Sequence, residues 1–128
     1  MASKRKKINL EFIFRASPTI IYNFVTTTAC LVRWYCDEVD ITNEEYTFYW
    51  QGSNETATLI DDIEDERVRF VWEDADDPEE YLEYRMYKSN VTNETILEIT
   101  DFCDADEVNE VKDLWQTLMV ELKKECGG

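Results

Sequence analysis

The sequence predicts a single α+β domain in which a curved, seven-stranded antiparallel sheet is covered by a long C-terminal helix. The chain has 128 residues, which suits one domain, and 44% of them are hydrophobic, which allows a substantial core. Short β-rich runs separated by polar turns fill the middle of the chain. The final segment instead repeats apolar residues every three or four positions, which is the pattern of a helix with one buried face.

The first elements along the chain are a strand and two short helices. Apolar residues at alternate positions from Ile8 to Phe14 predict a half-buried strand. Ser17 followed by Pro18 predicts a helix start, because the hydroxyl can cap backbone N–H groups and proline suits the first helical position. Thr28 is the expected cap of the second helix.

Six β-rich runs follow, and the connections between them are short enough to predict neighbouring antiparallel strands. They cover residues 39–41, 46–51, 56–63, 68–73, 81–88 and 95–102. Alternation assigns one apolar face to the sheet. The residues expected on that face are Tyr46, Phe48, Trp50, Val68, Phe70, Trp72, Tyr84, Met86, Leu97 and Ile99.

The last element is a long amphipathic helix. Asp104 and Glu107 have the spacing of a capping box, with a carboxylate in place of the usual hydroxyl. About 20 residues at about 1.5 Å each predict a helix of about 30 Å, long enough to cross the sheet. Its apolar stripe comprises Val108, Val111, Trp115, Leu118, Met119 and Leu122.

The charge of the chain excludes several classes of function. Asp and Glu outnumber Lys and Arg by 29 to 13, and the resulting net charge of −16 repels nucleic acids and anionic membranes. Histidine is absent, which removes the commonest general base, the commonest metal ligand and every Ser–His or Cys–His pair. We therefore expect no catalytic residues, no metal and no cofactor.

The sequence lacks the patterns expected of a membrane span and of a signal peptide. No apolar run reaches the ~18 residues of a membrane span, and no apolar stretch follows the lysine-rich start as it would in a signal peptide. We expect a cytoplasmic protein. Residues 1–7 are expected to form a disordered basic tail, and residues 8–126 the single domain.

Two acidic loops, 61–66 and 73–80, contain eleven carboxylates between them. The spacing and glycine of a calcium-binding EF-hand are missing, so we interpret the loops as solvated surface. The alternative is an electrostatic face for a basic protein partner.

Several runs follow one another in a characteristic order. Ser17-Pro18 follows the first strand, and Leu31-x-x-Trp34-Tyr35 comes next. The runs 46–50 and 69–73 are aromatic strands, and the run 97–102 leads into the tryptophan-bearing last helix. These runs, in this order, resemble the START-like (helix-grip, SRPBCC) superfamily, close to its heat-shock-protein ATPase activator homologue (Aha-type) branch and especially to small bacterial START-like domain proteins. The resemblance spans nearly the whole chain and implies the helix-grip fold, with the order β-α-α-β6-α.

The superfamily includes binders of lipids, hormones and other apolar molecules, aromatase/cyclase enzymes and chaperone-associated modules. Its members hold ligands between the curved sheet and the final helix. The resemblance implies a non-catalytic carrier or sensor of a small hydrophobic ligand. Because apolar walls alone bind weakly, such a ligand needs a polar anchor, and Tyr84 and the Trp34 indole are the candidates. The implied cavity is lined by Trp34, Phe48, Trp50, Phe70, Trp72, Tyr84, Met86, Trp115 and Met119.

Three alternatives stay open. The aromatic residues of the inner face would equally suit a filled core without any cavity. A protein-interaction module would use the acidic surface to attract a partner, as the chaperone-ATPase-activator branch suggests. A cyclase-type enzyme is the third reading, and the missing histidine disfavours it.

Overall fold

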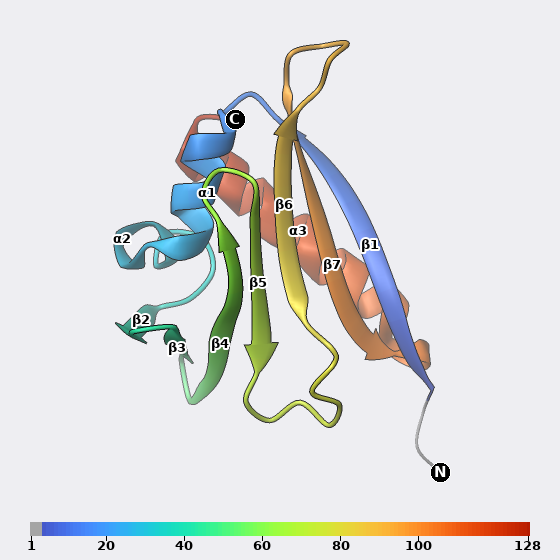
Figure 1. Ribbon diagram of the computed structural model, residues 1–128. Coiled ribbons are helices and arrows are strands. Elements are labelled where there is room, and N and C mark those ends of the chain that lie inside the picture. The colour runs from blue at the N-terminus through green and yellow to red at the C-terminus, as the bar shows by residue number, and fades with distance from the viewer. Residues whose placement is uncertain (1–3) are drawn as a thin grey trace.

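The computed structural model describes residues 4–128, and it has the element order that the sequence predicts. One strand and two short helices precede six strands and a C-terminal helix (Figure 1). The elements are β1 (Arg5–Phe14), α1 (Pro18–Thr26), α2 (Thr28–Leu31), β2 (Glu38–Thr42), β3 (Glu45–Trp50), β4 (Ser53–Ile63), β5 (Arg67–Trp72), β6 (Leu82–Lys88), β7 (Thr95–Asp104), η1 (Ala105–Glu107) and α3 (Val108–Cys126).

The strands form one seven-stranded antiparallel sheet in the order β1-β7-β6-β5-β4-β3-β2. β2 to β7 follow one another as a meander, and β1 adds to the free edge of β7. The helix α3 crosses one face of the sheet, while α1 packs beside it against β5 and β6 (Figure 1). The predicted α+β fold, a curved sheet covered by a terminal helix, is confirmed.

The start of β1 corrects the prediction of a disordered tail over residues 1–7. Residues 1–3 lie outside the described part of the chain, but Arg5 already pairs with Asp104 of β7, and Lys7 with Phe102. The Arg5 guanidinium also forms ion pairs with Glu80 and Asp104. Backbone pairing and these ion pairs place the basic segment in the sheet.

The two short helices begin close to where the sequence predicts. The Ser17 hydroxyl accepts a hydrogen bond from the backbone N–H of Ile20 at 3.3 Å, which confirms the predicted cap of α1. Thr28, expected to cap α2, is instead its first helical residue. The cap position belongs to Thr27, whose hydroxyl donates to the Asn23 carbonyl of the preceding helix and so makes no capping bond.

The long helix α3 ends as predicted but begins differently. Asp104 and Glu107 do not form a capping box, because a 3-10 turn intervenes and neither side chain caps a backbone N–H. The Asp104 carboxylate accepts a hydrogen bond from Arg5 instead. Gly127 ends the helix at φ 92°, a left-handed conformation that glycine adopts without strain. None of the helices within residues 4–128 is long and apolar enough to cross a membrane.

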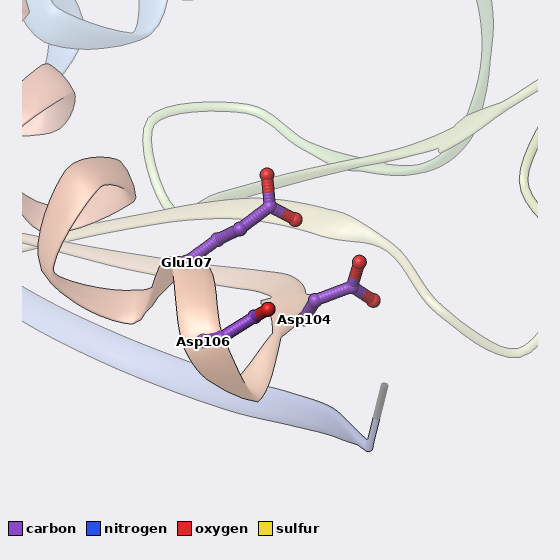
Figure 2. Close-up of side chains that lie close together, drawn as sticks. All are labelled: Asp104, Asp106 and Glu107. Atoms are coloured by element: carbon purple, nitrogen blue, oxygen red, sulfur yellow. The ribbon is translucent and has the colours of Figure 1, made fainter. Parts of the chain in front are cut away.

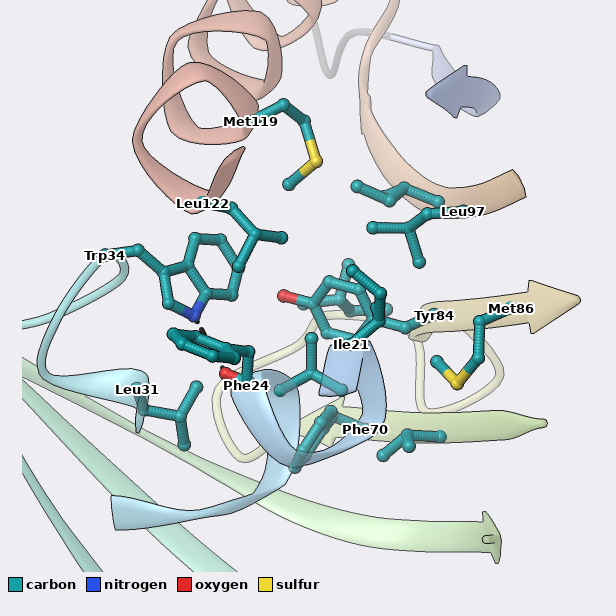
Figure 3. Packing of buried hydrophobic residues seen from close by; sticks show 14 of the residues in the cluster. Ile21, Phe24, Leu31, Trp34, Phe70, Tyr84, Met86, Leu97, Met119 and Leu122 are labelled. Atoms are coloured by element: carbon teal, nitrogen blue, oxygen red, sulfur yellow. Dashed lines mark hydrogen bonds between the residues drawn. The ribbon is translucent and has the colours of Figure 1, made fainter. Parts of the chain in front are cut away.

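Large apolar side chains fill the space between the sheet, α1 and α3. Phe70, Tyr84 and Met119 are each 2% exposed, and they contribute from the sheet and from α3 to one continuous core (Figure 3). Edge-to-face ring contacts join Phe70 to Tyr84 and Tyr84 to Trp34, with 6.5 Å between ring centroids in both pairs. The middle of the sheet is therefore covered by packed side chains, and an open site must lie elsewhere.

Candidate functional site

A pocket of about 450 Å³ opens at the end of the sheet where β5 joins β6, near the bottom of Figure 1. Its volume lies within the usual range of small-molecule sites. The ends of β3, β5 and β7 and the starts of β1, β4 and β6 meet at this edge. The first half of α3 and the loop after α2 complete the wall.

Aromatic side chains form much of the wall, and hydrogen bonds hold two of them in place. The Trp50 indole donates to the Tyr35 carbonyl at 2.8 Å, and the two rings meet edge-to-face at 5.6 Å. The Trp115 indole donates to Asp101 Oδ2 at 3.0 Å. Trp72 and Phe102 add two further apolar surfaces. These rings offer a fixed, preorganised surface to a flat or branched apolar molecule.

Asp101 places a carboxylate inside this aromatic wall. Its Oδ2 accepts from Trp115, and its Oδ1 accepts from the backbone N–H of Phe102 at 2.8 Å. Burial raises the pKa of Asp101 above its ordinary value, although both hydrogen bonds and the charge of Arg5 oppose the shift. Our sequence reasoning missed this residue. The signal that points to it is its parity with Leu97 and Ile99, which places Asp101 on the inner face of the sheet.

Two phenol groups lie near Asp101. Burial raises the pKa of Tyr35 and of Tyr84, and the negative charge of Asp101 adds to both shifts. Both hydroxyls are neutral at physiological pH and can donate and accept hydrogen bonds. Within residues 4–128, neither hydroxyl has a hydrogen-bonding partner, and Tyr35 lines the pocket. The Tyr35 hydroxyl is therefore a polar group available to a bound molecule.

The mouth of the pocket is acidic. Its wall carries the carboxylates of Glu55, Asp74, Asp76 and Glu80 in addition to Asp101. Burial raises the pKa of Glu55, and the neighbouring charge of Asp74 raises it further. Glu55, Asp74 and Asp76 are exposed side chains and form the outer, solvated part of the wall.

Arg5 is the only cationic side chain in the described pocket wall, and it is already engaged. Its Nη2 and Nε bind the two oxygens of Glu80 at 2.6 and 3.0 Å, and its Nη1 binds Asp104 at 2.9 Å. The hydrogen bonds to Glu80 and Asp104 raise the pKa of Arg5, and the two carboxylates offset much of its positive charge. The pocket therefore presents a net negative charge.

Three of the nine residues expected to line a cavity, Trp50, Trp72 and Trp115, line this pocket. The alternation of each strand identifies its inner face, but it does not say at which end of the strand the face stays uncovered. Here α1 packs against β5 and β6 and α2 against β2, and the end of the sheet where β5 joins β6 stays open. The three tryptophans lie at the open end.

The other six residues belong mainly to the packed interior. Three of them, Phe48, Phe70 and Tyr84, line a void of only about 10 Å³, close to the minimum for a single water molecule. The Trp34 indole, expected as a polar anchor, donates to the Phe24 carbonyl at 2.8 Å and is not available to a ligand. The six are Trp34, Phe48, Phe70, Tyr84, Met86 and Met119 (Figure 3 labels all but Phe48).

A separate group of carboxylates lies where β7 leads into α3. Oxygens of Asp104, Asp106 and Glu107 lie within 4.8 Å of one another (Figure 2). Arg5 lowers the pKa of Asp104, while a hydrogen bond with Asp104 raises the pKa of Glu107. These side chains are largely exposed, and Asp104 is already bonded to Arg5 and Glu107, so the group carries no metal assignment.

Comparison with known proteins gives several likenesses over most of the chain. The solution structure of a Bacteroides fragilis protein is 31% identical and has a TM-score of 0.69, and the match covers 96% of this chain and 92% of that one. The Aha1 dimer from Colwellia psychrerythraea is 19% identical with a TM-score of 0.78, over 94% and 96% of the two chains. DynU16, from the dynemicin biosynthetic locus, is 16% identical with a TM-score of 0.77, over 92% of this chain and 46% of that one. The last two likenesses concern the fold alone.

A search of curated proteins found no significant match. The family comparison is decisive, because the model of the START-like superfamily domain matches residues 1–128. The resemblance in the sequence, the helix covering a curved antiparallel sheet and this match agree: the chain belongs to the START-like superfamily.

Proposed function

We propose that the protein is a non-catalytic binding domain that carries or senses a small ligand with an apolar body. The ligand lies in the open-end pocket, between the ends of β3, β5 and β7 and the first half of α3. The observation that carries this proposal is the pocket of about 450 Å³ with three tryptophans in its wall and Asp101 within it. Membership of a superfamily that includes ligand binders supports it.

Apolar contact alone gives only weak binding. A ligand that buries about 250 Å² at about 25 cal/mol/Å² gains about 6 kcal/mol, against about 4 kcal/mol or more lost on association. Useful affinity therefore requires polar anchors. Asp101 and the Tyr35 hydroxyl are the groups within the pocket that supply them.

The composition of the pocket favours binding over chemistry. Its described wall contains no serine, threonine, cysteine, lysine or histidine, so it offers no nucleophile–base pair of the usual kind. A cyclase-type reaction would have to use Asp101 or Tyr35 as its acid or base, and it remains the third alternative.

A protein-interaction role is the second candidate. The loop 73–80 borders the pocket and carries six carboxylates, which would speed association with a basic partner. The fold likeness to the Aha1 dimer fits this reading. Neutralising the loop tests it: a pull-down should lose its partners, and partners that survive the change would contradict the interaction role.

Native mass spectrometry of protein freshly purified from its host tests the leading proposal. We expect a small molecule bound to the native protein. Leu114→Trp should displace it by filling the pocket, because Leu114 lines the pocket and is 56% exposed. The matched control is Val120→Trp, which adds the same ring to an equally exposed position of α3 outside this pocket, at 54%. A native protein with the unliganded mass, or equal loss of the bound molecule in Leu114→Trp and Val120→Trp, would contradict the proposal.

A further inference from the structure

We propose that the ligand is an organic cation, with an amine or quaternary ammonium group attached to an apolar body. This inference rests on the proposed function and names the chemical class of molecule that the pocket takes. It comes from three features of the same cavity: the placement of its carboxylates, the engagement of its one arginine and the aromatic composition of its wall.

The carboxylates differ in exposure, because Asp101 is half-buried whereas Glu55, Asp74 and Asp76 are exposed. Asp101 lies on the inner face of β7 and Glu55 on the inner face of β4, where Glu55 is paired in register with Phe48. Asp74 and Asp76 lie on the loop between β5 and β6. None of these four carboxylates has an ion pair within residues 4–128. Arg5 offsets the partly buried charge of Asp101 only in part, and a cation entering the pocket relieves the remaining penalty.

The same arrangement disfavours the other ligand charges. An anion would enter a wall of five carboxylates and find a single arginine that Glu80 and Asp104 already hold. A neutral molecule would fill the apolar space but would leave Asp101 more desolvated than before. Only a cation improves both the apolar contacts and the electrostatics.

The wall also suits the cation itself. Indole and phenol faces attract ammonium groups, most strongly when the site excludes water. Trp50, Trp72 and Trp115 supply three indoles around the cavity. The enclosed Tyr35 hydroxyl, which has no partner among the described residues, can accept an N–H from a primary ammonium group. It is an unused polar group within the pocket, independent of the acidic cluster.

A set of three probes with one apolar body tests the inference. Isothermal titration at low salt would measure the binding of 2-(1-naphthyl)ethylamine, 2-(1-naphthyl)ethanol and 1-naphthaleneacetate. The amine should bind at least tenfold more tightly than the alcohol, and the acetate should give no detectable binding. Equal affinity for the amine and the alcohol would overturn the cation inference and leave the binding function standing. No binding of any probe would overturn both.

Charge-removing variants separate the pocket from the overall charge of the protein. Asp101→Asn and Glu55→Gln should each lower the ratio of the affinity for the amine to the affinity for the alcohol several-fold. Glu11→Gln is the matched control, because it removes the same charge from an exposed position on the outer side of β1. A melting curve of each variant verifies folding, and Glu55→Gln decides the outcome if Asp101→Asn unfolds. A preference that falls equally in Glu11→Gln, or stays in both pocket variants, would overturn the inference.

Discussion

Replacing Trp115 tests whether α3 holds the pocket together. The ring is 3% exposed, it meets Tyr84 edge-to-face at 6.0 Å, and its indole donates to Asp101 at 3.0 Å. Trp115→Ala removes all three contributions and should lower the free energy of unfolding by about 3–5 kcal/mol. Trp115→Phe keeps most of the packing but leaves Asp101 Oδ2 without its donor, which costs about 1–3 kcal/mol.

Urea denaturation followed by circular dichroism measures both values, since it does not depend on tryptophan fluorescence. Leu114→Ala is the neighbouring control, because an exposed side chain should change the free energy of unfolding by about 0.5 kcal/mol or less. The penalty of Trp115→Phe should shrink as the pH falls, because the indole stabilises the charged form of Asp101. A loss below about 1 kcal/mol for Trp115→Ala, or a pH-independent penalty for Trp115→Phe, would refute the reasoning.

Three further results are expected. The pKa of Asp101 is raised in the folded state, so the folded protein binds this proton more tightly than the unfolded chain does. The stability that this group contributes therefore falls as the pH rises from 3.8 through the folded pKa. Asp101→Asn should flatten that part of the pH–stability curve, and an unchanged curve would contradict the assignment. Ser17→Ala should lower the free energy of unfolding by about 1 kcal/mol through loss of the α1 cap, and an unchanged urea midpoint would show that the cap contributes nothing. Added salt should raise the melting temperature by screening the net charge of −16, and a salt-independent melting temperature would contradict this self-repulsion.

Local patterns in the sequence predict the fold well. Some local patterns predict burial even when the element that packs against them is unknown. Examples are the alternation of Leu97 and Ile99 and the helical spacing of Trp115, Met119 and Leu122. All five residues are buried in the structure, on the inner face of β7 and on the inner face of α3. Capping is less predictable, since the Asp104 carboxylate has a stronger partner in Arg5, far away in the sequence.

The site is only partly predictable. Aromatic residues at the middle and at the end of a strand give the same sequence pattern, so Phe70 and Trp72 were both predicted to line the cavity. Only Trp72 lines the pocket. Which end stays open depends on where α1 and α2 pack, and that is a tertiary property. Asp101 could have been predicted from the sequence, because a carboxylate at a position that alternation assigns to the apolar inner face is an exception to the pattern.

The nitrogen-15 spectrum of the four tryptophan indole N–H groups gives the most direct test of the proposed pocket. Titration with 2-(1-naphthyl)ethylamine should shift the signals of Trp50, Trp72 and Trp115, which line the pocket, and leave that of Trp34, which is bonded to Phe24 in the packed interior, unmoved. A dominant shift of the Trp34 signal would place the ligand inside the core, and four unmoved signals would mean that the open end of the sheet binds no such molecule.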